Sequence, residues 1–348
     1  MYAKCEQFER QIMENRISIQ QIAAEAGVSI ATVSRVINAP EKVAEHTRKR
    51  IEAIIQKYHY QPNLLAQGLR NNQMPIVGIL VPDLANEFFA NIVIQLQQDL
   101  FHCGYWAIIC NSNKSKVMQL SYLKMLIDQN ISGMIAISFD SSPIAWPGDI
   151  PTVFVDRRPM DCDCIDRHAI VESDNYQGGY MATQELIACG CRKIALITTC
   201  DLINIYADRE RGYRDALKQN GIDVEAVPVQ RMDSIGVAEG AAAIDRLLDS
   251  GIGFDGVFAT ADLFAMGALQ RLKQRNISVP GAVQLVGFDD MSMTEYSSPS
   301  ITSVHQYSER LAAVAVECLR TLMEPGKHNA MYHKIPVKLI QRDSTKRP

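Results

Sequence analysis

The chain has 348 residues, of which 47% are apolar and 21% are charged, and its formal net charge is −4. This length predicts two or three domains, and the composition is typical of a globular protein. No apolar run reaches the roughly 18 residues that a membrane-spanning helix needs, and the charged N-terminus lacks the apolar stretch of a secretion signal. We therefore expect a cytoplasmic protein with no membrane partner.

The cysteines do not predict a disulfide framework or a metal site. Nine cysteines in a chain without a secretion signal favour reduced thiols. Two pairs are closely spaced, Cys162 with Cys164 and Cys189 with Cys191, and His168 lies near the first pair. Neither pair has the C-x2-C spacing of ordinary zinc sites, so we expect no metal and no cofactor.

The charge is unevenly distributed along the chain. Residues 1–73 carry a net charge of +3, and the remaining residues carry −7. A basic head on an acidic body is compatible with nucleic-acid binding by the head, although it does not require it.

Residues 17–38, "ISIQQIAAEAGVSIATVSRVIN", predict two short helices joined by a turn. The first helix covers residues 19–26, Gly27 supplies a turn that needs a positive φ, and Ser29 caps a second helix from Ile30 to about Asn38. Helical spacing turns one set of apolar side chains inward, namely Ile22, Ala23, Ala26, Val33, Val36 and Ile37. The small Ala23 lets the two helices cross closely, as a helix-turn-helix requires.

The outward face of the second helix carries Ala31, Ser34, Arg35 and Asn38. In a helix-turn-helix this face enters the major groove of DNA. There Arg35 would donate two hydrogen bonds to a guanine, and Ser34 and Asn38 would contact base edges or phosphates. The same pattern also fits a helical hairpin with a solvated polar face.

A third helix is predicted over residues 45–58, with Ile51, Ile54 and Ile55 turned inward. A basic cluster lies near its start and consists of His46, Arg48, Lys49 and Arg50. The helix dipole disfavours cations in the first turn, so this cluster is better explained by nearby phosphates.

Residues 61–72, "QPNLLAQGLRNN", have the polar character of a linker but contain three leucines. Apolar side chains exposed in a linker gain nothing from burial, so these leucines call for a partner surface.

From Ile76 onward, apolar strands alternate with helices, and the pattern restarts after Asn175. Two such series predict an α/β body of two doubly wound parallel sheets with helices on both faces. Ligands of such sheets bind at the carboxyl ends of the strands, here in a cleft between two subdomains. The chain has no G-x-S-x-G, Walker or H-E-x-x-H motif, so we do not expect an enzyme.

Five motifs occur in the order and spacing of the lactose-repressor (LacI/GalR) family of bacterial transcription regulators. They are "IAAEAGVSIATVSRVIN", "YHYQPNLLAQGLR", "IVGILVPDLANEFF", "ATADLFAMGAL" and "LVGFDDM". The chain resembles this family from residue 19 to about 345. The resemblance implies an allosteric DNA-binding repressor with a three-helix helix-turn-helix domain and a periplasmic-binding-protein-like body.

The resemblance also implies the domain boundaries. An N-terminal extension would cover residues 1–16, the helix-turn-helix domain 17–61, the hinge helix and linker 62–74, and the effector-binding and dimerisation domain 75–348. Within this last domain, the N-subdomain would comprise about 75–174 and 305–332, and the C-subdomain about 175–304 and 333–345.

DNA contacts are implied for Ser18, Ser29, Ile30, Ala31, Ser34, Arg35 and Asn38. The segment from Pro62 to Arg70 resembles a hinge helix, which is too short to be stable alone and would order when two copies meet on the operator. Leu69 would then wedge between base pairs in the minor groove, while Asn63 and Gln67 contact the DNA. The alternative is a short exposed helix that packs on the body.

Effector contacts are implied for Phe88, Phe89, Asp174, Arg209 and Asp289. Charged groups would bond the hydroxyls or ring nitrogens of a small polar effector, and Phe89 would stack on its ring. The alternatives are structural roles: Asp289 and Asp290 as turn caps, Phe88 and Phe89 as core residues, and Arg209 as a surface cation.

Several positions depart from the family pattern. Ala44 replaces the usual capping Ser, Glu87 replaces the usual Pro, and Ala261 replaces a frequent Asn. The segment "QRMDSIG" also lacks an aromatic residue that some relatives have. We expect a sugar or sugar derivative as the effector, with a purine-like base as the second choice.

We expect a homodimer on a pseudo-palindromic operator, because two-fold protein symmetry implies two-fold operator symmetry. The effector would shift a two-state equilibrium of the body. The rival interpretations are a secreted sugar-binding protein with the same body, an enzyme that uses the cleft carboxylates, and a regulator that activates some promoters.

Overall fold

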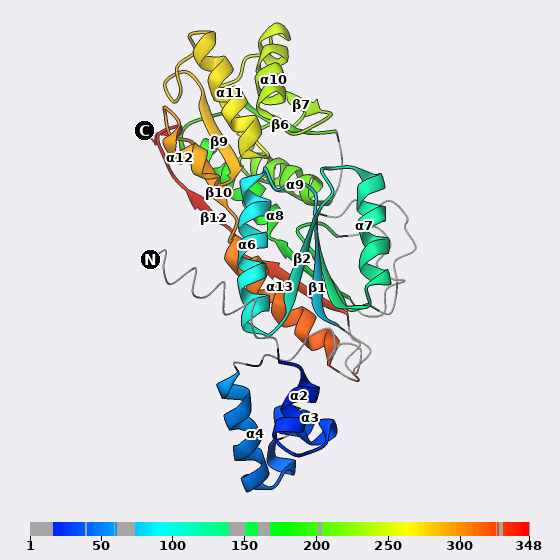
Figure 1. Ribbon diagram of the computed structural model, residues 1–348. Coiled ribbons are helices and arrows are strands. Elements are labelled where there is room, and N and C mark those ends of the chain that lie inside the picture. The colour runs from blue at the N-terminus through cyan, green and yellow to red at the C-terminus, as the bar shows by residue number, and fades with distance from the viewer. Residues whose placement is uncertain are drawn as a thin grey trace, which may run out of the picture. The chain divides into compact units, whose positions relative to one another are not determined.

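The computed structural model describes residues 17–38, 40–58, 60, 74–138, 150–158, 168–200, 204–324, 326 and 330–347. The chain divides into two compact units between Met74 and Pro75, a head and a body, each described here by itself (Figure 1). The predicted N-terminal extension, 1–16, and nearly all of the predicted hinge and linker, 62–74, lie outside the described residues.

The head contains α2 (Ile19–Glu25), α3 (Ile30–Asn38), the short 3-10 helix η1 (Pro40–Lys42) and α4 (Glu45–Lys57). Ser18 and Gln21 form a reciprocal capping box at the start of α2. Gly27 has a φ of 61°, and the Ser29 hydroxyl accepts a hydrogen bond from the Thr32 N–H at 3.2 Å. The predicted turn and cap are therefore confirmed.

The core of the head forms where the three helices meet. Ile22, Val33 and Ile51 are fully buried, and Ala23 is buried where α2 and α3 cross. The Lys57 ammonium lies 2.8 Å from the Glu25 carboxylate and joins α4 to α2. Ala44 precedes α4 without a side-chain cap, as the sequence predicts.

The first sheet of the body has six strands in the order β11-β5-β4-β3-β1-β2. Their bounds are β1 (Met74–Val81), β2 (Trp106–Asn111), β3 (Ile131–Ile137), β4 (Thr152–Val155), β5 (His168–Ser173) and β11 (Met331–Ile335). The helices α6 (Glu87–His102) and α13 (Ser308–Met323) share one core with this sheet, and α7 (Lys116–Asp128) packs in another. Neighbouring residues of β1 enter different cores, Ile79 with α6 and Leu80 with α7, so the sheet is covered on both faces.

The second sheet has the order β12-β10-β9-β8-β6-β7. Its strands are β6 (Ile194–Thr199), β7 (Val229–Met232), β8 (Gly256–Ala259), β9 (Gln284–Asp289), β10 (Thr302–His305) and β12 (Lys338–Ile340). The helices α10 (Val237–Asp249) and α11 (Asp262–Gln274) cover one face, and α8 (Asn175–Ala188) and α9 (Asn204–Gln219) the other. The predicted doubly wound architecture is confirmed, with an antiparallel pairing of β10 and β12 at one edge.

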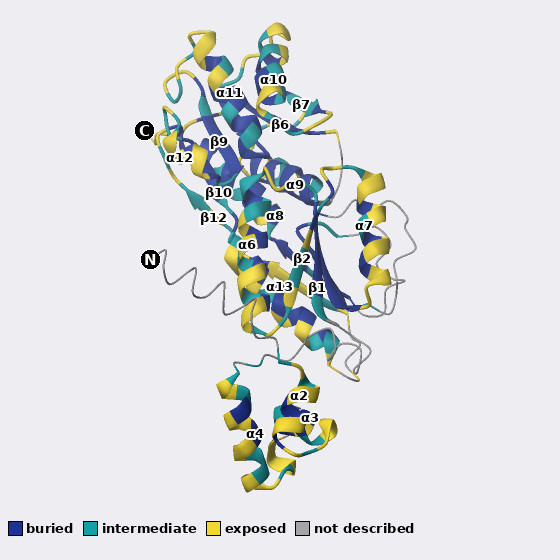
Figure 2. Ribbon diagram, in the orientation of Figure 1, coloured by how far each residue is buried: buried dark blue, intermediate teal, exposed yellow. Residues whose placement is uncertain are grey.

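Four interior strands, two in each sheet, are buried along their whole length. Every residue of β3, β4, β6 and β8 is buried. The strands of both sheets are largely dark blue in Figure 2. This burial explains why these strands read as continuous apolar runs rather than as alternating patterns. No helix in the described part of the chain is long and apolar enough to cross a membrane.

The chain passes between the two sheets three times, after β5, after β10 and after β11. The last passage corrects one predicted boundary. We expected the first subdomain to end at residue 332, but β11 pairs in parallel with β5 from Met331 through Ile335. The regular ladder with β5 keeps these residues in the first sheet up to Ile335.

The helices α8 and α9 approach each other through glycines. A β-carbon on Gly212 of α9 would lie 2.1 Å from the Tyr176 carbonyl oxygen of α8, and one on Gly179 of α8 would lie 2.1 Å from the Arg209 carbonyl oxygen of α9. Real β-carbons do not approach backbone atoms this closely. The close packing holds α9, which carries Arg209, against α8.

We expect Gly212→Ala to lower the free energy of unfolding by about 1–3 kcal/mol, because the added methyl group forces the two helix backbones apart. Urea denaturation followed by circular dichroism measures this change. Gly253→Ala is the matched control, since a β-carbon there has only the Lys193 Nζ atom nearby, at 3.9 Å. Equal stability of the two variants would contradict the close helix contact.

Candidate functional site

The body contains a cavity of about 480 Å³ whose walls come from both subdomains. Residues that directly follow strands of the first sheet line one side, including Pro82, Ser112, Ser138 and Asp156. Asp233 follows β7 on the other side, and Asp289 ends β9. The cavity therefore lies at the carboxyl ends of the parallel strands, where doubly wound sheets bind ligands.

Four of the five predicted effector residues line this cavity: Phe88, Phe89, Arg209 and Asp289. The rings of Phe88 and Phe89 lie 5.5 Å apart between centroids. Phe88 is 6% exposed and also belongs to the core of the first subdomain, so it combines the two roles considered for it.

Asp174, the fifth predicted effector residue, is not among the residues that line the cavity. Its carboxylate accepts a hydrogen bond from the Gln177 N–H at 3.1 Å and caps α8. It also lies 3.9 Å from the Lys334 ammonium. The carboxylate is engaged at a helix start, in a capping role that the sequence analysis did not consider for this residue.

Arg209 is the best anchored residue of the cavity and is only 2% exposed. Its Nε donates to the Asn175 Oδ1 at 2.8 Å, and its Nη1 donates to the Thr260 carbonyl oxygen at 2.6 Å. The guanidinium carbon lies 3.5 Å from the centre of the Phe288 ring. These contacts come from α8, the end of β8 and β9, so the charge is fixed before any ligand arrives.

Asp289 lies beside this guanidinium, 3.7 Å from Nη1, and accepts a hydrogen bond from the Gln306 Nε2 at 2.7 Å. Burial raises the pKa of Asp289 to about 7, against the opposing effect of Arg209, and the nearby Asp156 raises it further. The backbone of Asp289 has a φ of 115°, which is uncommon for a residue with a side chain. Such strained backbone conformations cluster at ligand sites.

Other residues line the cavity that the sequence analysis did not select, namely Gln119, Asp156, Arg157, Tyr206 and Gln306. Asp156 directly follows β4, so the rule that ligand contacts lie at the carboxyl ends of strands also applies to Asp156. Tyr206 precedes Arg209 by three residues on α9, which places both side chains on one helix face. Burial raises the pKa of Asp156, and it raises that of Tyr206 to about 12.

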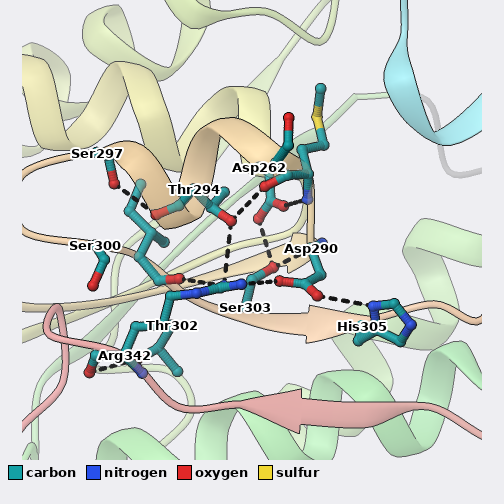
Figure 3. A network of polar contacts seen from close by, with 12 residues as sticks. Asp262, Asp290, Thr294, Ser297, Ser300, Thr302, Ser303, His305 and Arg342 are labelled. Atoms are coloured by element: carbon teal, nitrogen blue, oxygen red, sulfur yellow. Dashed lines mark hydrogen bonds and ion pairs between the residues drawn. The ribbon is translucent and has the colours of Figure 1, made fainter.

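A network of polar contacts supports the cavity behind Asp289 (Figure 3). The buried Asp262 carboxylate accepts hydrogen bonds from the Met291 N–H at 2.8 Å and from the Ser303 hydroxyl at 2.7 Å. Asp290 lies 2.7 Å from Arg342 and 2.8 Å from His305. This network holds the segment after β9 against β10 and the segment that follows β12. Ala261, which replaces a frequent Asn, lines the cavity just before Asp262.

On the head, the structure exposes most of the predicted DNA-binding side chains. Ser18, Ser29, Ile30, Ala31 and Arg35 are exposed. The side chain of Asn38, and the hinge residues Asn63, Gln67 and Leu69, lie outside what the structure describes.

The prediction that Ser34 lies on the outward face of α3 is wrong, because this side chain is only 6% exposed. Residues three positions apart on a helix differ by about 60° in direction, so Ser34 flanks the inward-facing Ile37. It therefore lies beside the buried stripe of α3, and Arg35 is the exposed polar residue next to it.

The basic cluster of α4 is partly paired within its own helix. The Lys49 ammonium lies 2.7 Å from Glu45, and the Arg48 Nε lies 3.6 Å from Glu52. His46 and Arg50 are exposed. Exposed pairs of this kind contribute little to stability, so these side chains can exchange their partners for phosphates.

Cys189 and Cys191 are buried free thiols beside α8, and burial raises the pKa of each, to about 11 and about 12. Cys191 belongs to the apolar core under α8 and α9. Cys162 and Cys164 lie outside the described residues.

Comparisons with known proteins agree with this arrangement. Residues 18–63 match the family "Bacterial regulatory proteins, lacI family", and residues 183–345 match the "Periplasmic binding protein-like domain". The HTH-type transcriptional regulator RegA of Clostridium saccharobutylicum is 33% identical over 336 residues, which are 94% of this chain and 99% of RegA.

Solved structures share the fold. The transcriptional regulator CelR–cellobiose complex has a TM-score of 0.72 at 29% identity and matches 94% of this chain and 100% of its own. The lac repressor dimer bound to operator and the anti-inducer ONPF has a TM-score of 0.79 at 24% identity and matches 95% and 99%. The chain therefore belongs to the lacI family of bacterial regulatory proteins, which are DNA-binding transcription regulators and not enzymes.

Proposed function

We propose that this regulator is a cytoplasmic repressor that binds a pseudo-palindromic operator as a homodimer and senses a neutral sugar in the cavity of its body. The proposal of a neutral effector rests on the balance of positive and negative charge in the cavity. Its walls carry four carboxylates and four cations, namely Asp83, Asp156, Asp233, Asp289, Lys114, Lys116, Arg157 and Arg209. A purely anionic or cationic ligand would meet four groups of its own charge.

Sugar hydroxyls fit such walls because each can donate to a carboxylate and accept from a guanidinium. The rings of Phe88, Phe89 and Tyr206 supply the apolar surface that the carbon face of a sugar needs. Within the walls, the Lys114 ammonium lies 3.1 Å from the Asp83 carboxylate, so these two charges neutralise each other. The cellobiose in the CelR structure is a neutral sugar of this class.

Exposed apolar side chains support the homodimer. Phe101 and Trp106 of the first subdomain are 66% and 55% exposed, and Tyr296 of α12 (Ser292–Tyr296) is 82% exposed. The Phe101 and Trp106 rings lie 6.3 Å apart between centroids, and contiguous exposed apolar side chains are typical of protein–protein contact surfaces. The lac repressor, which shares the fold, is a dimer on its operator.

On the operator, we propose that Arg35 reads a base and that the exposed cations of α4 contact phosphates. The hinge roles of Asn63, Gln67 and Leu69 belong to the same proposal and rest on the resemblance of their segment. We expect Leu69→Ala to weaken operator binding more than binding to unrelated DNA, because a wedge acts only where the duplex is kinked.

We expect Arg35→Ala to cost about 1–3 kcal/mol of binding free energy, confined to one base position of each half-site. Fluorescence anisotropy on operators selected from a random pool, each changed at one position, measures this cost. Arg50→Ala is the comparison variant and should weaken binding to all sequences about equally. A uniform loss for Arg35→Ala would reject its role in base recognition.

The effector proposal is tested by thermal shift with neutral pentoses, hexoses and disaccharides beside sugar acids, sugar phosphates and purines. A ligand at a hundred times its dissociation constant should stabilise the protein by about 2.7 kcal/mol. Asp289→Asn should abolish the shift, whereas Asp174→Asn, which retains a good helix cap, should preserve it. Hits confined to phosphates, acids or purines would reject a neutral sugar, and silence across the panel would reject the sensor role.

We expect the affinity for the sugar found in this way to rise with pH between 5.5 and 7.5. The pKa of Asp289 is raised to about 7, so in the free protein a proton occupies this carboxyl below that pH. A hydroxyl that donates to the carboxylate binds the ionised form, and binding must then release the proton. At acidic pH the affinity should fall by about tenfold per pH unit. Isothermal titration calorimetry across this pH range measures the affinity. An affinity that is the same at every pH would contradict a hydrogen bond from the sugar to the Asp289 carboxylate.

A further inference from the structure

The two subdomains are joined directly at the edge of the cavity by Glu87. This residue begins α6 in the first subdomain, and its carboxylate accepts hydrogen bonds from Ser292 at the start of α12 in the second. The Ser292 N–H lies 3.1 Å from Oε1 and 3.0 Å from Oε2, and the Ser292 hydroxyl lies 2.8 Å from Oε2. The neighbours Phe88 and Met291 both line the cavity.

The second-subdomain end of this contact is held firmly (Figure 3). Asp262 accepts from the Met291 N–H, and the Thr294 hydroxyl donates to the Met291 carbonyl oxygen at 2.6 Å. Arg342 Nη1 donates to the Ile301 carbonyl oxygen at 2.9 Å while Arg342 pairs with Asp290. Ser292 therefore moves with the second subdomain and not as a free loop.

The first-subdomain end is equally well fixed. The Asn86 side chain caps α6 by accepting from the Phe88 N–H at 3.0 Å. Further along α6, Ile92 and Leu96 are fully buried in the core of the first sheet. A change in the distance between Glu87 and Ser292 therefore requires a movement of one subdomain relative to the other.

We propose that Glu87 is a clamp that favours the closed cleft before any ligand enters, and thereby sets how readily the regulator responds to its effector. Hydrogen bonds to an ionised carboxylate are roughly twice as strong as neutral ones. A contact that exists only in the closed state raises its population, and the effector then has less of the closing free energy to supply. This role concerns regulation of the proposed effector site and rests on that function.

A second link between the subdomains shows what the clamp adds. Arg158, after β4, lies 3.0 Å from Glu172 of its own subdomain and 3.0 Å from Asp208 of α9. The subdomains therefore stay joined through Arg158 when Glu87 is replaced. Removal of the clamp should change the balance between open and closed states without separating the subdomains.

Glu87→Pro is the sharpest variant, because it removes the carboxylate and preserves the helix. Asn86 is the cap, so Glu87 occupies the first helical position, where proline is favoured. Asn86 has a φ of −78° and a ψ of 118°, an extended conformation that suits a residue before proline. Glu295→Ala is the matched control, since Glu295 is an exposed carboxylate in the first turn of α12.

Hydroxyl-radical footprinting of the ligand-free, full-length protein tests the clamp by comparing the oxidation of two tyrosines of α9. Tyr206 of α9 lines the cavity and is 8% exposed, whereas Tyr213 of α9 is fully buried in the core. We expect Glu87→Pro to raise the ratio of open to closed protein about tenfold, the factor that loss of a charged hydrogen bond gives. The oxidation of Tyr206 should therefore rise several-fold, with Tyr213 unchanged. Glu295→Ala should leave both tyrosines as in the parent protein.

Unchanged oxidation of Tyr206 in Glu87→Pro would overturn the clamp. So would a parallel rise of Tyr206 and Tyr213 in both Glu87→Pro and the milder Glu87→Gln, because that pattern reports unfolding of α9. No sugar is present in the experiment, so its result is independent of the ligand panel. If Glu87→Pro gives the expected oxidation but no sugar of the panel stabilises the protein, the clamp stands and only the sensor role is rejected.

Discussion

The buried guanidinium of Arg209 is the interaction on which the cavity depends. Its charge lies out of water and is balanced by Asp289, while Asn175 and Thr260 accept hydrogen bonds from its Nε and Nη1 atoms. Removing one partner of a buried pair costs several kcal/mol, because the other charge remains unpaired. The protein therefore meets the cost of holding this charge during folding, and a ligand that enters finds the polar groups already in place.

Fixed contacts within each subdomain also determine how the two subdomains can move. Gly179 and Gly212 hold α8 and α9 together, and the Asp262 and Asp290 contacts hold the start of α12. Each subdomain is thus rigid, and only a few contacts across the cleft restrain the movement of one subdomain relative to the other. In such an arrangement a ligand acts by changing populations of whole-body positions rather than by deforming either half.

The sequence predicts the elements of this fold well, because helix caps and apolar runs are local signals. It predicts the cavity less completely. Asp156 lies at the carboxyl end of a strand as Asp289 does, but no family motif marks it, so the sequence analysis did not select it. Asp174 was selected from its motif, yet a carboxylate before a helix serves equally well as a cap. Ser34 lies at the border of the buried stripe, where tertiary packing and not periodicity decides its burial.

The passage of β11 into the first sheet has a consequence for how the chain is made. Residues 331–335 complete the first sheet and residues 338–340 complete the second, so both lack an edge strand until these residues have been synthesised. Contacts between residues so far apart form slowly, and open sheet edges favour aggregation meanwhile. The head has its whole described core within residues 17–60 and has no such dependence. On the ribosome, the DNA-reading head is thus complete long before the sensor that will control it.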